Sequence, residues 1–290
     1  MTGDPFIAHR SLLFTVAYQM LGSAADAEDV LQESWLRWAE VDQSRVSDAR
    51  AYLVRTVTRQ ALNRLRTLAR SREDYVGEWL PDPLLTSPDV AEDAELAESV
   101  SIAMLTVLET LGPTERAVFV LREVFELPYA EIAETIGKSA PAVRQIARRA
   151  RDHVAARRPR VQVSRSEQQA VMERFLLALR TGQLQELVEV MAPDVILVAD
   201  GGGLAAAALA PIQGAELVAK VLARPDRVEG AVLATTAVWL NGAPAGRIEM
   251  DGVLATAVSL VVENGQVTRV YLMRNPRKLT RLDEPVELTR

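Results

Sequence analysis

The chain has 290 residues, of which 49% are hydrophobic and 25% charged, which is typical of soluble globular protein with two or three domains. The absence of cysteine excludes disulfides and thiolate metal sites, and the two histidines, His9 and His153, are too far apart in sequence to suggest a metal cluster. The longest apolar run, from Val253 to Val262, is too short for a membrane span. We therefore expect a cytoplasmic protein with no metal or cofactor.

The charges are unevenly distributed along the chain. The net charge of −6 would disfavour DNA binding if the charges were evenly spread. However, every charged residue between Arg50 and Arg72 is an arginine, and the segment from Arg144 to Arg160 contains a single carboxylate, Asp152. The sequence thus predicts two basic surfaces in an otherwise acidic protein.

An acidic helix is expected first, because Ser23-Ala-Ala-Asp26 resembles a capping box. Four residues at helical spacing should face the core: Ala27, Leu31, Trp35 and Trp38. The outward stripe is acidic with one apolar member: Asp26, Asp29, Glu33, Leu36 and Glu40. Such a stripe repels DNA, so any partner should be a basic protein; an ordinary solvated face fits this segment equally well.

A basic helix is expected from Ala49 to Arg70. Its core-facing residues are Leu53, Val57, Ala61, Leu65 and Leu68. Another side carries a cationic stripe of Arg55, Arg59, Asn63, Arg66 and Arg70. This stripe can follow a phosphate backbone, with an affinity that falls steeply with salt because phosphate contacts release counterions. The alternative is a solvated face, although solvated faces normally mix both signs of charge.

A proline-rich connector follows between Glu78 and Pro88, where three prolines prevent a regular helix. Trp79 and Leu80 lie at its start and need burial. We therefore expect the connector to dock on a neighbouring domain.

A helix-turn-helix is expected between Leu127 and Arg151. The first helix should end at Gly137, which tolerates the left-handed conformation, and Ser139 should cap the second helix. The apolar stripe of the second helix consists of Val143, Ile146, Ala147 and Ala150. The outward or flanking residues are Arg144, Gln145, Arg148, Arg149 and Arg151. Arginine and glutamine on one helix face suit the major groove, whereas the alternative is an arginine-rich solvated helix.

The remaining sequence predicts an α+β domain. A helix from about Glu167 to Arg180 and a shorter helix precede a buried strand from Val195 to Asp200. Further strands are expected at 231–240, 247–250, 254–263 and 266–273, with hairpin turns at Asn241-Gly242 and Asn264-Gly265. Helices before a curved antiparallel sheet predict an α+β cone.

The cone has few candidates for chemistry. Its possible acids are Asp200, Glu216, Glu249 and Asp251, but none is accompanied by an obvious donor constellation, so we expect no enzyme. The glycines Gly201, Gly202 and Gly203 allow either close approach of another backbone or simply a flexible turn.

Three blocks in this order resemble an extracytoplasmic-function (ECF) sigma factor of bacterial RNA polymerase: 26–38, 51–66 and the helix-turn-helix. The resemblance implies that residues 1–75 are the second sigma region, with core-binding residues Asp29, Glu33 and Arg37. The loop 41–48 and the Arg55 helix would engage the minus-ten element. Residues 95–158 would be the fourth sigma region, whose helix 139–151 reads the minus-thirty-five element. The implied DNA-binding residues are Arg55, Arg59, Asn63, Arg66, Ser139, Arg144, Gln145, Arg148 and Arg149.

The linker, residues 76–94, resembles that of sigma factors with a SnoaL-like carboxy-terminal extension, with Asp82 in place of a glutamate. Residues 165–280 would be this extension, followed by a tail at 281–290. Two motifs resemble the subgroup, 200–203 and 275–279, but Leu204 replaces a common lysine and Arg277 a common acid. The implied interdomain regulatory residues are Trp79, Leu80, Pro81, Asp200, Gly201, Gly202, Gly203, Asn275 and Pro276.

The fold class expected from these features is two all-α sigma domains, the second containing a helix-turn-helix, followed by an α+β SnoaL-like cone. The expected function is a sigma factor that brings core RNA polymerase to promoter DNA and is regulated in cis by the cone, which leaves room for an unidentified small ligand. One alternative is a ligand-responsive helix-turn-helix repressor that would bind palindromic half-sites. A third interpretation is an enzyme that uses Asp200 and is fused to a DNA anchor.

Overall fold

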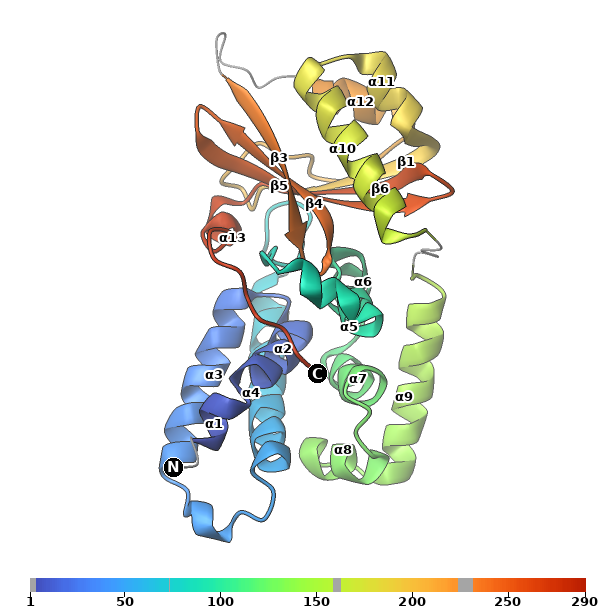
Figure 1. Ribbon diagram of the computed structural model, residues 1–290. Helices are drawn as coiled ribbons and strands as arrows, with labels where there is room; N and C mark the ends of the chain where they lie inside the picture. Colours follow the sequence, from blue (N-terminus) through green and yellow to red (C-terminus); the bar gives the residue numbers. More distant parts are fainter. Residues whose placement is uncertain (1–3, 73, 159–162, 224–231) are drawn as a thin grey trace.

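The computed structural model describes residues 4–72, 74–158, 163–223 and 232–290 (Figure 1). Arg160 and Ala231 lie outside the described residues, and so do the side chains of Arg70 and Arg72. Helices fill the lower part of the molecule in Figure 1, and a sheet with helices against one face forms the upper part. None of the described helices is both long enough and apolar enough to cross a membrane.

The N-terminal helical part consists of α1 (Pro5–Ala8), α2 (Arg10–Leu21), α3 (Ala24–Ala39), the 3₁₀ turn η1 (Gln43–Arg45) and α4 (Ala49–Arg72). Helix α2 is buried along almost its whole length because α3 and α4 both pack against it. Ser23 caps α3 by accepting the backbone N–H of Asp26, as expected. The prediction for Trp35 was wrong: its side chain lies at the edge of the packed face and is 44% exposed, whereas Trp38 is buried.

The middle helical part follows the 3₁₀ turn η2 (Pro88–Glu92). It consists of α5 (Ala94–Val100), α6 (Ile102–Leu108), α7 (Pro113–Phe119), the π-helical turn η3 (Val120–Val124), α8 (Tyr129–Ile136) and α9 (Ala140–Ala155). Gly137 ends α8 with φ 69°, and Ser139 caps α9, so the expected helix-turn-helix is confirmed. Most of the buried apolar residues of both helical parts form one continuous cluster.

The cone contains α10 (Arg165–Thr181), α11 (Leu184–Val190), β1 (Met191–Asp200), β2 (Ile212–Gln213), α12 (Ala215–Ala223), β3 (Leu233–Leu240), β4 (Ala243–Met250), β5 (Val253–Glu263), β6 (Gln266–Met273) and α13 (Pro276–Leu279). The sheet order is β2-β1-β6-β5-β4-β3, with β1 and β6 parallel and the other pairs antiparallel. The expected α+β cone is confirmed, whereas β2, α12 and α13 were not predicted. Because Asp200 pairs with Met273 at the ends of β1 and β6, the two motifs at 200–203 and 275–279 leave the sheet side by side.

The β3–β4 turn is the point at which the cone meets both helical parts. Asn241, at φ 53°, and Gly242 form the tight hairpin expected from the sequence, and Asn241 is completely buried. Its side-chain Nδ2 donates to the Tyr18 hydroxyl at 2.7 Å and to the Val100 carbonyl at 2.9 Å. Its Oδ1 accepts the Leu84 backbone N–H at 2.9 Å. One side chain therefore joins the N-terminal helices, the linker and the middle helices.

We predict that Asn241→Ala lowers the free energy of unfolding by about 2–4 kcal/mol, because it leaves buried groups of Tyr18, Leu84 and Val100 without this partner. Asn264→Ala is the matched control, because Asn264 has φ 52° in the other Asn-Gly turn but is exposed. Its expected cost is about 1 kcal/mol, from backbone strain alone. Denaturant unfolding of the two variants measures the difference, and equal losses would show that the Asn241 contacts contribute nothing.

Candidate DNA and polymerase interfaces and the interdomain latch

Helix α9 presents the cationic face expected from the sequence. Its apolar stripe, Val143, Ile146, Ala147 and Ala150, is buried against the middle helical part. The opposite face is exposed and consists of Arg144, Gln145, Arg148 and Arg149. The Arg148 side chain is 82% exposed and lies 4.0 Å from Asp152, a surface pair too weak to compete with a base or phosphate contact. The face is therefore open to a major groove.

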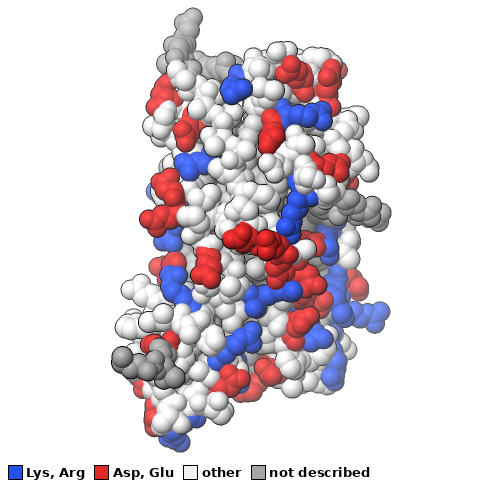
Figure 2. All heavy atoms as spheres, viewed as in Figure 1, with Lys and Arg blue, Asp and Glu red and all other residues white. Residues whose placement is uncertain are grey.

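The α4 stripe is arranged differently. Arg59 donates from Nε to the Thr135 carbonyl and from Nη2 to the Glu134 carbonyl, both at 3.0 Å. These carbonyls lie at the C-terminal end of α8, where a guanidinium also interacts favourably with the helix dipole. Arg55 lies 3.9 Å from the Glu134 carboxylate, whereas Asn63 and Arg66 are exposed. One end of the stripe is thus occupied by the helix-turn-helix. On the face of the molecule drawn in Figure 2, positive and negative side chains are interspersed.

The outward face of α3 combines carboxylates with exposed apolar side chains. Glu33 and Arg37 are exposed, and the Asp29 side chain is 57% exposed and lies 3.3 Å from Arg64. Arg64 pairs more closely with Asp26, at 2.6 Å. Trp35 and Leu36, which is 55% exposed, add apolar area to the same exposed surface. An acidic surface with exposed tryptophan and leucine suits a protein partner rather than DNA.

The linker is held to the cone by an interdomain latch, which we define as Tyr75, Leu80, Asp200, Asn275 and Lys278. The Asp200 carboxylate is completely buried. It accepts the Tyr75 hydroxyl at 2.6 Å, the Leu80 backbone N–H at 2.9 Å and the Lys278 Nζ at 2.8 Å. Burial and, to a smaller extent, the hydrogen bond to Asp200 raise the pKa of Tyr75. The hydroxyl therefore stays protonated and can act as a donor.

Lys278 and Asn275 complete the latch from the β6 side. Lys278 Nζ also donates to the Leu80 carbonyl and lies 3.9 Å from the centroid of the Trp79 ring, which is cation–π geometry. Asn275 Nδ2 donates to the Tyr75 hydroxyl at 2.9 Å. Pro81 is buried in the linker, and Pro276 is exposed at the start of α13. The sequence interpretation missed Tyr75 and Lys278, although Lys278 lies within the motif at 275–279.

The loop of Gly201, Gly202 and Gly203 leaves space for the linker to approach the cone. A Cβ built on Gly202 would lie 2.2 Å from Asn275 Nδ2 and 2.8 Å from the Tyr75 hydroxyl. A Cβ on Gly203 would lie 3.3 Å from Val76, and both glycines have positive φ. A Cβ on Gly201 would clash with its own loop at the Ala205 carbonyl. The expected close approach is therefore found at Gly202 and Gly203, but it is made by side chains and not by another backbone.

The linker also docks on the N-terminal helical part. The Asp82 carboxylate is buried and accepts the Ala24 backbone N–H at 2.8 Å, and the Asp82 N–H donates to the Gly22 carbonyl at 2.8 Å. Burial raises the pKa of Asp82, against the effect of Lys278. The Trp79 ring covers Gly22, where a Cβ would lie 2.7 Å from the ring. The expected docking of the linker is confirmed, on both neighbours.

Buried polar groups join the two helical parts directly. Arg116 of α7 is 1% exposed, donates from Nε to the Gln19 carbonyl at 3.0 Å and pairs with Glu109. Burial lowers the pKa of Arg116 to about 9, which leaves it protonated near pH 7. Gln19 Nε2 donates to Ser99 Oγ at 2.9 Å. The packing of the two parts is thus specific.

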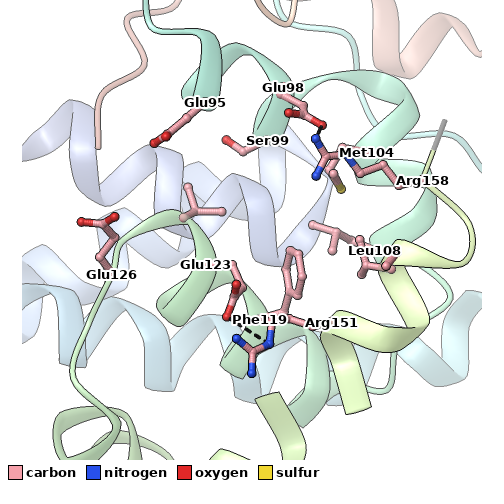
Figure 3. Close-up of a pocket in the computed structure, with 13 residues that line it drawn as sticks. Glu95, Glu98, Ser99, Met104, Leu108, Phe119, Glu123, Glu126, Arg151 and Arg158 are labelled. Carbon is pink, nitrogen blue, oxygen red and sulfur yellow. Dashed lines mark ion pairs between the residues drawn. The ribbon is translucent and has the colours of Figure 1, made fainter. Parts of the chain in front are cut away.

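The middle helical part contains a pocket of about 400 Å³ with an apolar floor and a charged rim (Figure 3). The floor includes Met104, Leu108, Phe119 and Val124. The rim carries four glutamates: Glu95, Glu98, Glu123 and Glu126. Arg158 pairs with Glu98, and Arg151 lies 3.8 Å from Glu123. The excess of carboxylates makes this pocket unsuitable for DNA.

A second cavity, of about 340 Å³, lies in the cone. It is mostly apolar, and the described residues that line it include the polar side chains of Thr256 and Arg274. The four acids considered for catalysis, Asp200, Glu216, Glu249 and Asp251, are not among these lining residues. The Asp200 carboxylate serves the latch instead.

Comparisons with known proteins agree with this architecture. The sigma-70 region 2 family matches residues 6–71, and the sigma-70 region 4 family matches residues 101–154. The ECF RNA polymerase sigma factor SigJ of Mycobacterium tuberculosis is 36% identical over 97% of this chain and 94% of its own length. The probable ECF sigma factor SigI of the same species is 32% identical over 94% of this chain and 92% of its own length.

A solved structure covers nearly the whole chain as well. The crystal structure of Mycobacterium tuberculosis SigJ matches with a TM-score of 0.76 and 33% identity, over 96% of this chain and 98% of that chain. Two sigma-70 regions in order, an exposed cationic α9 and similarity over almost the full length all agree. The chain belongs to the ECF sigma factors of RNA polymerase.

Proposed function

We propose that this sigma factor is held in a closed state by its own cone, and that it must open before it binds polymerase and promoter together. Residues 1–75 serve as the second sigma region, 76–94 as the linker, 95–158 as the fourth sigma region and 165–280 as the regulatory cone. The observation that carries the proposal is the contact of Arg59 with the α8 carbonyls.

Promoter geometry explains why this contact matters. The minus-ten and minus-thirty-five elements are about 25 base pairs apart, or roughly 85 Å along B-form DNA at 3.4 Å per base pair. In the closed state, the α4 stripe meets the helix-turn-helix at hydrogen-bond distance. The two surfaces cannot reach both elements from this arrangement, so the helical parts must separate.

The cone opposes this separation because it binds all the parts that would move. The latch holds the linker through Asp200, and Asn241 joins α2, the linker and α5. Any signal that weakens these contacts favours the open state by population shift. We propose that the cone cavity is a place where a small ligand, not yet identified, could act.

The acidic face of α3 is our candidate surface for core polymerase. Asp29, Glu33 and Arg37 lie there with Trp35 and Leu36, and this face is exposed in the closed state. The repressor alternative predicts protection of palindromic half-sites about one helical turn apart by the free protein. A footprint with asymmetric contacts at two separated elements, and only with core polymerase, supports the sigma-factor interpretation.

We predict that Arg148→Ala weakens recognition of the minus-thirty-five element by about 1–3 kcal/mol, because it removes a base or phosphate contact. Arg174→Ala in α10 is the matched control, because Arg174 is exposed and lies in the cone. Promoter titration of the holoenzyme measures both variants. An unchanged sequence preference in Arg148→Ala would remove this residue from the set that reads DNA.

Asp29→Arg should weaken capture by core polymerase about tenfold or more, because it places a like charge opposite a basic partner. Arg64 remains paired with Asp26 in this variant, so the fold should survive. The control is Glu189→Arg, an exposed carboxylate of α11. Pull-down of core polymerase tests the pair, and equal capture of the two variants would contradict a role for Asp29.

Asp200→Asn should raise transcription in vitro about tenfold or more, because it removes the carboxylate that lies 2.8 Å from Lys278 Nζ and so weakens the latch, whereas Asp82, at 3.9 Å, remains. Asp194→Asn is the control, since Asp194 lies on the same strand but is exposed. Run-off transcription with core polymerase gives the output of each variant. Equal output from Asp200→Asn, Asp194→Asn and the parent would show that the latch does not limit activity.

A further inference from the structure

We infer that residues 281–290 form a strap that holds the two helical parts closed, a task separate from that of the latch. The sequence expectation treated this segment only as a tail. Its apolar residues Leu282, Val286 and Leu288 are separated by charged residues, and Pro285 disfavours a helix. The segment runs extended from α13 past α2 toward the middle helices (Figure 1).

The strap is anchored first to the cone. Arg247 of β4 donates from Nη1 to the Leu282 carbonyl at 2.7 Å and lies 3.4 Å from the Asp283 carboxylate. Leu282 is completely buried in an apolar cluster that includes Leu80 of the linker and Ile102 of α6. The root of the strap therefore cannot move independently of the cone.

The middle of the strap pairs with the linker and enters the helical core. The Val286 backbone N–H donates to the Leu85 carbonyl at 2.8 Å. Leu288 is 4% exposed and belongs to the apolar cluster that both helical parts share. Burial of Leu288, together with that of Leu282, contributes more to the strap than its ion pairs do, because apolar area removed from water is worth more than exposed ion pairs.

The far end of the strap touches both helical parts at once. The Thr289 backbone N–H donates to Thr15 Oγ1 of α2 at 3.1 Å. Arg290 pairs with Asp93 at 2.8 Å and with Glu95, and Asp93 also caps α5 by accepting the Leu96 N–H. Thr15 and Glu95 lie in different helical parts, so these two neighbouring strap residues bridge them.

In sequence order, the strap contacts the cone, the linker, α2 and α5. Separation of the helical parts must break the contact at Thr15, the contacts at Asp93 and Glu95, or both. The far-end contacts are a backbone hydrogen bond and partly exposed ion pairs, which are individually weak. The far-end contacts of the strap can therefore break one after another when the cone moves.

This inference rests on the proposed closed state but not on polymerase or promoter binding, and a label pair can test it in the free chain. The absence of cysteine allows dyes to be placed at Thr67→Cys and Lys138→Cys, both exposed positions on opposite sides of the contact between α4 and α8. Thr67 lies eight residues beyond Arg59, or about 12 Å along α4. Single-molecule energy transfer then reports the closed and open populations.

We expect Leu288→Ala and Arg290→Ala each to raise the open population about threefold or more, and the double variant to raise it further. Arg281→Ala is the matched control, because Arg281 is an exposed arginine of the same segment. Arg290 is partly exposed, so its variant should keep the fold even if Leu288→Ala does not. Distance distributions of the Arg290→Ala chain and the double variant that match those of Arg281→Ala would overturn the inference, whatever the chain does in transcription.

Discussion

The arrangement of this sigma factor depends on the contacts of one buried carboxylate, that of Asp200. An ionised carboxylate removed from water needs compensating donors, and Asp200 receives them from Tyr75, Leu80 and Lys278. Tyr75 directly precedes the linker, Leu80 lies in the linker, and Lys278 belongs to the cone. Removing one partner of such a group costs far more than an exposed ion pair, because the remaining charge stays buried. These contacts therefore hold the linker in one fixed position on the cone.

Other contacts fix the positions of the helices relative to the linker and the cone. With the linker fixed, Asn241 reaches Tyr18 and Val100, and Asp82 reaches the start of α3. These contacts give hydrogen-bond partners to the buried Leu84 and Ala24 backbone N–H groups. The result is that the two regions that should separate on promoter DNA share one apolar core in the free protein. Opening must be driven by partners that bind the open state better than the closed one.

Local sequence pattern was sufficient to predict the helix-turn-helix and the exposed cationic face of α9. The α9 stripe follows from helical periodicity, and the end of α8 at Gly137 and the start of α9 at Ser139 follow from conformational preferences that act within a few residues. The same reasoning was wrong for Trp35, because periodicity assigns a face but does not show where the packed area ends. The strands of the cone followed from alternation and Asn-Gly turns.

Long-range partners were beyond the sequence interpretation. Asn241 was predicted only as a turn residue, and its partner Tyr18 lies 223 residues away in sequence. Lys278 lies in a motif singled out by resemblance, but nothing local indicates that it pairs with Asp200 rather than with solvent. The fold class and the exposed cationic face of α9 could thus be predicted from local sequence patterns, whereas the closed arrangement depends on contacts between distant segments.

The most direct measurement is the distance between labels at residues 67 and 138 before and after core polymerase and promoter DNA are added. We expect the separation to increase by tens of ångströms toward the spacing of the two promoter elements, because α4 and the helix-turn-helix must part to reach both. An unchanged distance in a complex that initiates transcription would contradict the closed-to-open mechanism.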